Sequence, residues 1–308
     1  MPLKTSLKEE FQAVAPGRVR FDEPMRLHTT FRIGGPAEIW VQPASVEELR
    51  ELVALAREGD LPVTLVGGGA NLLVRDEGIP GLVVNLSDRG FQEVEARGEE
   101  IAAGAALPLE RLVRRAQELG LRGVEFLAGV PGRVGGAVRM NAGTHDDEGK
   151  IHSFSDVIRS VTVMDFEGQV KVLRREEIPF AYRHSGLSDS IVLEAALALA
   201  PGDPAAIARR VQRLWDFKKR TQDWSAPSVG CIFKNPPGKS AGQLVDQAGF
   251  KGRRIGGARV SPVHANFILN VSDARAADVL ALVEEIRAGV RRKFEVELET
   301  EVQILPHG

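Results

Sequence analysis

The sequence has one cysteine, Cys231, among its 308 residues. A disulfide within the chain is therefore impossible, and the lack of further cysteines argues against a zinc site, so we predict no metal. The chain also lacks the run of roughly 20 apolar residues that a membrane span needs. Its N-terminal residues, Met1 to Arg20, lack the apolar segment of a signal peptide. We expect a cytoplasmic protein with no membrane partner.

A strong excess of charge is missing as well. The formal net charge is −2, so no overall basic field would recruit nucleic acid. Hydrophobic residues make up 43% of the chain and charged residues 27%, which is the balance of a globular protein with a full core. The length predicts about two or three domains.

Glycine, in contrast, is concentrated in two places. The run Gly129–Gly136 holds four glycines and a proline, and Asn141-Ala142-Gly143 follows it. Such a run is not expected to form a helix or strand, but it can bring backbone N–H groups close to an anion. A second run, Gly67-Gly68-Gly69, lies earlier in the chain. Together the two runs indicate one long, phosphate-bearing cofactor that is held from two sides.

The first third of the chain reads as a β-α-β-type unit. Ser45-Val-Glu-Glu48 is a capping-box pattern that predicts a helix ending at Gly59. Strands are expected at 37–41, 62–66 and 81–86. The first glycine run then follows the second strand, where open α/β sheets tend to bind ligands.

From about residue 91 the pattern predicts a mainly antiparallel sheet. Strands are expected at 101–106 and 190–199, and a hairpin turns at Asp165-Phe-Glu-Gly168. An amphipathic helix should start near Pro108 and end at Gly120.

Pro201-Gly-Asp-Pro204 is the predicted linker to the last part of the chain. There we expect a helix to about Lys219, a short helix at 240–248, strands at 258–260 and 266–271, a long helix through 280–294 and a strand at 299–305. The predicted parts are 1–85, 86–200 and 201–308.

Several motifs occur in an order that resembles one family, the UDP-N-acetylenolpyruvoylglucosamine reductases. They run from about Thr29 to Leu305 and are Gly67-Gly-Gly-Ala-Asn-Leu-Leu, Gly129-Val-Pro-Gly with Gly135-Gly136, Asn141-Ala-Gly, Tyr182-Arg183-His-Ser185, Gly230-Cys-Ile-Phe-Lys-Asn-Pro, Ile255-Gly-Gly257, Ser261 with His264-Ala265, and Glu301-Val302. The resemblance implies an α+β fold. It consists of a two-lobed FAD-binding domain of the vanillyl-alcohol-oxidase (PCMH) type, at 1–85 and 86–200, and a C-terminal α+β substrate-binding domain. The short spacing from Tyr182 to Cys231 resembles the compact subtype.

The resemblance implies the following reaction. NADPH reduces a noncovalent FAD and leaves. The enolpyruvyl ether of UDP-N-acetylglucosamine then enters the site that NADPH occupied. Hydride passes to the methylene carbon, and a proton is added to the neighbouring carbon. The product is UDP-N-acetylmuramate, a peptidoglycan precursor that is needed for cell shape and division. The implied partners are NADPH and the nucleotide sugar, and we expect a monomer.

Three catalytic residues follow from the resemblance: Arg183, Cys231 and Glu301. The planar fork of Arg183 suits a carboxylate, and Glu301 is expected to be protonated or hydrogen-bonded beside an anionic substrate. Cys231 stands where many relatives have serine as the proton donor, and a thiol is the stronger acid. The plain alternatives are a surface arginine, a solvated acid and a packed cysteine.

The remaining site residues are also implied by the resemblance. The substrate-binding set is Tyr182, Arg183, Lys219 and Asn235. For Asn71 and Asn141 a turn-forming role is nearly as well supported. The cofactor-binding set is Val66, Gly67, Gly68, Gly69, Ala70, Asn71, Leu72, Gly129, Pro131, Gly132, Gly135, Gly136, Asn141, Ala142 and Gly143.

Four positions depart from the family pattern: Arg133, His145, Thr221 and Gln303. They leave open the exact flavin and diphosphate contacts. Two other readings also stay open. One is an FAD-dependent oxidase or dehydrogenase on the same scaffold, with the flavin tethered through His145. The other is a flavin or nucleotide-sugar binding protein without catalysis.

Overall fold

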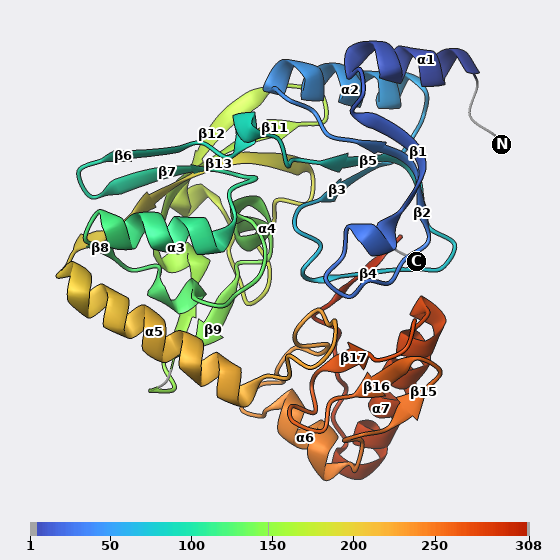
Figure 1. Ribbon diagram of the computed structural model, residues 1–308, viewed down its shortest axis with the longest axis vertical. Helices are drawn as coiled ribbons and strands as arrows, with labels where there is room; N and C mark the ends of the chain where they lie inside the picture. Colours follow the sequence, from blue (N-terminus) through green and yellow to red (C-terminus); the bar gives the residue numbers. More distant parts are fainter. Residues whose placement is uncertain (1–4, 147, 307–308) are drawn as a thin grey trace. The chain divides into compact units, whose positions relative to one another are not determined.

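The structure is a computed structural model that describes residues 5–146 and 148–306 (Figure 1). The chain forms two compact units, each built from separate stretches of sequence. Unit 1 contains the described residues up to Phe21, then Ile39–Gly68 and Gly81–Lys218. Unit 2 contains Asp22–Glu38, Gly69–Pro80 and the chain from Lys219 onward. The sequence analysis divided the chain into the continuous ranges 1–85, 86–200 and 201–308. That division stays a prediction.

The N-terminal part of unit 1 combines two helices with a sheet. The helix α2 (Val46–Glu58) begins as predicted: the Ser45 side chain accepts a hydrogen bond from Glu48 N. It packs beside α1 (Thr5–Val14), which the sequence analysis did not predict. The sheet has the order β1-β2-β5-β3, with bounds Val19–Pro24, Pro36–Val41, Ile79–Asn85 and Val63–Val66. Strands β3 and β5 pair in parallel, and α2 lies between β2 and β3 in the chain, as in the predicted β-α-β-type unit.

The rest of unit 1 is built on the predicted antiparallel sheet. Its order is β12-β11-β13-β7-β6, with bounds Val170–Arg174, Ile158–Asp165, Ser190–Ala198, Glu100–Gly104 and Val94–Arg97. The predicted hairpin is confirmed, because Met164 pairs with Val170 across its turn. Helices α3 (Leu109–Glu118) and α4 (Val134–Arg139) lie on one face of the sheet (Figure 1). The buried stripe of α3 is Leu109, Leu112, Val113 and Ala116.

Helix α4 corrects the prediction for the central glycine run. The run was expected to avoid helix, yet Val134, Gly135 and Gly136 form its first turn. Backbone bonds to the turn that follows β7 support this first turn, because Val134 N donates to Leu107 O at 3.0 Å and Gly135 N to Ala105 O at 2.9 Å. Packing against the sheet therefore overrides the low helix propensity of glycine.

The remaining elements of unit 1 are short strands and one long helix. Strand β8 (Leu121–Arg122) pairs with β14 (Ala200–Pro201), and β9 (Gly143–His145) pairs with β10 (Ile151–Ser153). Helix α5 (Pro204–Thr221) follows the predicted linker and ends at the boundary with unit 2. Short 3-10 helices of unit 1 lie at Arg89–Phe91, Glu125–Leu127, Phe154–Asp156 and Arg175–Glu177, and one of unit 2 lies at Met25–Leu27.

Unit 2 has its own hydrophobic core around Phe233, Val260 and Ile286. A three-stranded antiparallel sheet, β15-β16-β17, packs with α7, and α6 lies beside α7 (Figure 1). The bounds are Arg254–Ile255, Ala258–Val260 and Ile268–Asn270 for the strands, Ala241–Gln247 for α6 and Ala276–Phe294 for α7. Strand β18 (Gln303–Leu305) is shorter than predicted and runs parallel to β4 (Leu72–Val74).

Candidate cofactor and catalytic site

The first glycine run leaves the end of β3 and is anchored by Asn85. The buried Asn85 side chain donates from Nδ2 to the carbonyls of Val66 and Gly67, at 2.7 and 2.8 Å. In a trans peptide the C=O and the following N–H point in opposite directions. The N–H groups of Gly67 and Gly68 therefore point away from Asn85, which is the orientation that an anion site needs.

The second run comes close to the first inside unit 1. A Cβ atom built on Gly68 would lie 3.3 Å from the Cα of Gly132 and 3.7 Å from Cγ of Arg133. A side chain at position 68 would occupy the narrow space between the runs. Gly68 and Gly132 therefore lie close together. It stays a prediction that the two runs hold one cofactor from two sides.

Helix α5 supports the second run from behind. Gly129 has a φ of +71°, and a Cβ atom there would lie 2.4 Å from Cε3 of Trp215. One turn further along α5, Lys218 is 3% exposed and donates from Nζ to the carbonyls of Phe126 and Ala128, at 3.2 and 2.6 Å. Burial lowers the pKa of Lys218 to about 8 from its ordinary 10.5.

The Asn141-Ala142-Gly143 segment contacts the predicted catalytic arginine. Asn141 has a φ of +41°, its Nδ2 donates to Ala181 O at 3.0 Å, and its Oδ1 accepts from Ser155 N at 3.0 Å. These bonds give Asn141 a structural role. A Cβ atom on Gly143 would lie 3.2 Å from Nη1 of Arg183, so glycine leaves room for the guanidinium.

Tyr182 and Arg183 occupy the tip of a tight turn. Ala181 and His184 pair across it through bonds of 2.9 and 3.2 Å. Arg183 has a φ of +56°, which a residue other than glycine seldom adopts. Its guanidinium lies over the Tyr182 ring, 5.0 Å from the ring centre. Backbone strain of this kind is common where a side chain must be presented to a ligand.

The predicted cofactor-binding set is divided between the two units. Val66, Gly67 and Gly68 belong to unit 1, while Gly69, Ala70, Asn71 and Leu72 belong to unit 2. Gly69 has a φ of +64°, and a Cβ atom there would lie 2.0 Å from His28 O. The other members, from Gly129 to Gly143, all belong to unit 1.

Unit 2 brings Cys231 and Glu301 onto neighbouring stretches of chain. Glu301 N donates to Ile232 O at 2.8 Å, and Phe233 pairs with Thr300. On the other side, Cys231 pairs with Phe267. The Nδ2 of Asn71 donates to Glu301 O at 3.1 Å, so this predicted flavin contact also anchors Glu301. Both Cys231 and Glu301 are partly exposed.

The other predicted substrate-binding residues lie on the surface. Lys219 is exposed near the end of α5, next to the buried Lys218. Asn235 is exposed, and its Oδ1 accepts from Ala241 N at 3.0 Å at the start of α6. Lys234 forms an ion pair with Glu299 at 3.3 Å. Tyr182 is half exposed.

Contacts are defined for three of the departing positions, Arg133, Gln303 and His145. Arg133 is partly buried, which lowers its pKa, and Nη1 donates to the carbonyls of Leu86 and Ala106. It therefore braces the second glycine run from within unit 1. Gln303 donates from Nε2 to Glu301 O at 3.2 Å. His145 is exposed, and its Nδ1 lies 3.4 Å from Gly149 O.

Three residues that hold the predicted site were not predicted from the sequence: Asn85, Lys218 and Asn266. For Lys218 a signal was present, because it continues the stripe Ile207, Val211, Leu214 at helical spacing. Asn85 and Asn266 carry no such signal, since the segments that they bond lie 18–19 and 33 residues away.

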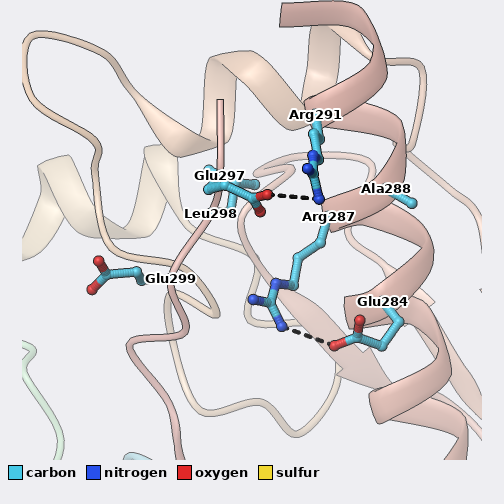
Figure 2. A pocket seen from close by; sticks show the side chains of 7 residues that line it. All are labelled: Glu284, Arg287, Ala288, Arg291, Glu297, Leu298 and Glu299. Atoms are coloured by element: carbon cyan, nitrogen blue, oxygen red, sulfur yellow. Dashed lines mark hydrogen bonds and ion pairs between the residues drawn. The ribbon is translucent and has the colours of Figure 1, made fainter. Parts of the chain in front are cut away.

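A hollow on unit 2 contains none of the predicted site residues (Figure 2). Figure 2 shows Arg287 paired with Glu284 and Arg291 paired with Glu297, both at 3.0 Å. These arginines are already neutralised by carboxylates. The hollow therefore offers no clear anion site, and we do not assign the substrate to it.

Within residues 5–146 and 148–306, no group of three or more His, Cys, Asp or Glu side chains is placed to hold a metal ion. None of the helices in the same ranges is both long and apolar enough to cross a bilayer.

Comparison with known proteins first identifies the class. Residues 37–174 match the FAD binding domain family. Berberine bridge enzyme shares the fold over 64% of this chain and 44% of its own, with a TM-score of 0.50 and 16% identity. The chain thus contains an FAD-binding domain of the PCMH type, joined to a second α+β unit, and the predicted fold class is confirmed.

The family follows from closer relatives. Residues 222–305 match the C-terminal domain of UDP-N-acetylenolpyruvoylglucosamine reductase. Reductases of that name from Halalkalibacterium halodurans and Bacillus subtilis are 40% and 39% identical, covering 97% and 96% of this chain and 98% and 97% of their own. The crystal structure of the Thermus caldophilus enzyme matches with a TM-score of 0.80 and 38% identity, over 94% of this chain and 99% of its own. The chain belongs to the UDP-N-acetylenolpyruvoylglucosamine reductase family.

Proposed function

We propose that this protein reduces UDP-N-acetylglucosamine enolpyruvate to UDP-N-acetylmuramate, with NADPH as donor and noncovalent FAD, in the cytoplasmic synthesis of peptidoglycan precursors. The observation that carries the proposal is the placement of Cys231 and Glu301 on paired stretches of unit 2. A proton donor and a charge-stabilising acid are the two groups that this reduction requires besides hydride.

The residues of unit 1 fit the cofactor. The N–H groups of Gly67 and Gly68 and the close approach of Gly132 suit the diphosphate of FAD, because bare backbone can approach the phosphates closely. When bound, FAD would take up hydride from NADPH and pass it to the methylene carbon of the substrate. Arg133 and Lys218 hold the second run through backbone carbonyls.

The protein side chains would guide the rest of the reaction. Arg183 would bind the carboxylate of the enolpyruvyl group through its planar fork. Glu301 would face the same anionic group while protonated or hydrogen-bonded. The Cys231 thiol would give its proton to the carbon next to the carboxylate, where negative charge develops after hydride addition.

One assay tests the proposal directly. Purified protein should be yellow, carry about one FAD per chain, and sustain turnover of NADPH, in preference to NADH, only when the enolpyruvate is added. An oxidase would instead consume oxygen without that substrate, and flavin tethered through His145 would stay in an acid-precipitated pellet. Colourless protein that takes up no FAD would overturn the proposal. We further propose a monomer, for which size-exclusion chromatography should give about 33.4 kDa.

The two half-reactions separate the roles of the residues. Arg183→Ala and Glu301→Gln should leave bleaching of the flavin by NADPH largely intact, because neither side chain is assigned to that step. Both should slow reoxidation by the enolpyruvate. Normal reoxidation in both variants would remove these residues from the mechanism.

A further inference from the structure

Asn266 lies two residues before β17, and its side chain is 2% exposed. Its amide forms two hydrogen bonds with a single residue of another segment. Phe233 N donates to Oδ1 at 2.9 Å, and Nδ2 donates to Phe233 O at 2.8 Å. These partners fix the orientation of the amide, because a backbone N–H only donates and a carbonyl only accepts. The backbone carbonyl of Asn266 accepts a third bond, from Ile232 N at 2.8 Å.

The segment that Asn266 holds lies between the two assigned groups of unit 2. Cys231 directly precedes Ile232 and Phe233. From the other side, Glu301 N donates to Ile232 O at 2.8 Å and Val302 N to the same oxygen at 3.4 Å. A shift of Ile232 would therefore move the Cys231 backbone and the Glu301 backbone together.

A chain of buried polar contacts supports Asn266 in turn. Its backbone N donates to Nδ1 of His264 at 3.3 Å, and burial lowers the pKa of His264, which favours the neutral ring with an acceptor nitrogen. His264 N donates to Ser261 Oγ at 3.0 Å. Ser261 Oγ donates to the buried carboxylate of Asp223 at 2.6 Å. The backbone of Asn266 is thus linked through His264 and Ser261 to the carboxylate of Asp223.

We infer that Asn266 is a positioning residue that sets the place of the Cys231 thiol and the Glu301 carboxyl for proton delivery. The inference rests on the roles proposed for Cys231 and Glu301. Proton transfer needs donor and carbon within hydrogen-bond reach, and a misplacement of about 1 Å can cost 10²-fold in rate. An asparagine bonds both the N–H and the C=O of Phe233, which no apolar side chain can do.

Two substitutions test the inference in the FAD-loaded enzyme. Asn266→Asp keeps the size and one acceptor but loses the donor to Phe233 O. Asn266→Leu loses both bonds. The first variant keeps the test decisive if the second fails to fold. For both, bleaching by NADPH should stay within about twofold, while reoxidation by the enolpyruvate should slow by about 10- to 100-fold.

A second readout does not depend on turnover. Cys231 is the only thiol, so its alkylation by iodoacetamide can be followed directly across pH. A displaced thiol should change its alkylation rate by about threefold or more, because reactivity depends on the local surroundings.

Asn270, the last residue of β17, offers a matched control. Its Nδ2 donates to Phe31 O at 3.1 Å and its Oδ1 accepts from Ala274 N at 2.9 Å, so it makes the same kind of bonds to other segments. Asn270→Asp should lower the melting temperature while leaving thiol alkylation and reoxidation unchanged.

The outcomes separate this inference from the proposed function. Asn266 variants that are less stable but keep wild-type alkylation and reoxidation rates would overturn the inference. Near-normal turnover in Cys231→Ala would instead overturn the donor assignment, and the alkylation result for Asn266→Asp would still show whether Asn266 positions this segment.

Discussion

Two regions of the molecule hold site residues in different ways. The glycine frame, in unit 1, consists of Gly67–Gly68 and Gly129–Gly132, and it is braced by a tight contact with Trp215 and a buried cation, Lys218. The donor frame, in unit 2, consists of Cys231–Phe233 and Thr300–Val302, and it is braced by isolated β-bridges and the neutral amide of Asn266.

The difference matches the two tasks. A diphosphate is recognised by backbone N–H groups, so side chains would block its approach. The supporting residues therefore donate hydrogen bonds to backbone carbonyls and leave the N–H groups open to the ligand. A proton donor is a side chain, so its backbone must be held at fixed spacing on both sides. The glycine frame should therefore be most sensitive to added atoms, and the donor frame to lost hydrogen bonds or a lost proton.

The largest expected effect is in the donor frame. Cys231→Ala should still reduce its flavin with NADPH but lose about 10²–10⁴-fold in turnover, the usual cost of a missing general acid. Stopped-flow absorbance of the flavin measures both steps.

Cys231→Ser is the matched control, and it should recover much of the loss because a hydroxyl can also give up the proton. Alkylation of the thiol should inactivate the enzyme, with substrate protecting. Turnover of Cys231→Ala within a few-fold of wild type would show that the residue merely packs.

The glycine frame should respond to one added methyl group. Gly129→Ala should cost about 2–5 kcal/mol of stability, because alanine is strained at positive φ and overlaps Trp215. FAD affinity should fall with it. Urea unfolding and FAD titration of the reconstituted protein provide the two measurements.

Two variants sharpen this test. Trp215→Leu should relieve the overlap but not the strain at φ, so a double-mutant cycle should show coupling. Gly136→Ala should change stability by less than about 1 kcal/mol, since a Cβ there meets nothing within 4 Å. An equal cost at both glycines would contradict the packing argument.

These regions also show how far the sequence could predict the structure. Helix α2 and the hairpin of β11 and β12 were predictable because their signals are local: a capping serine and a four-residue turn. Helix α4 was missed because its first turn depends on bonds to Leu107 and Ala105. The β4–β18 pairing joins residues some 230 positions apart, like the bond from Asn71 to Glu301, and no local pattern indicates it. The three catalytic residues were predicted from motif resemblance. The residues that support the site, Asn85, Lys218 and Asn266, became evident only from the structure.

The comparison extends to pH, first on the alkaline side. The pKa of Lys218 is depressed to about 8, so between pH 8 and 10.5 the unfolded chain binds more protons than the folded one. Stability from this group should therefore rise with pH through that window, by at most about 3 kcal/mol.

The difference in unfolding free energy between wild type and Lys218→Met should increase from pH 8 to 10. Lys219→Met, on the exposed neighbour, should show no such change. If the difference in unfolding free energy between wild type and Lys218→Met does not change from pH 8 to 10, the pKa of Lys218 is not depressed into this range.

The smallest expected effect is a loss of stability at low pH. It involves Asp223, which is linked through Ser261 and His264 to Asn266, the residue that braces the donor frame. Burial raises the pKa of Asp223, but hydrogen bonds from Ser225 and Ser261 outweigh it, so the pKa lies below its ordinary value. Such a group stabilises the fold above about pH 4, and that contribution is lost as pH falls through the folded pKa. Ser225→Ala removes the Oγ bond of 2.6 Å while Ser225 N still donates to the same carboxylate oxygen. It should cost about 1–2 kcal/mol at pH 7, and the difference from wild type should shrink as pH falls through the depressed pKa of folded Asp223, because protonation removes the charge that strengthens the bond. Urea unfolding at pH 7, 5, 4 and 3 measures it. If the difference in unfolding free energy between wild type and Ser225→Ala stays constant over this range, the bond does not depend on the charge of Asp223. A loss of stability in acid would then have to come from another carboxylate.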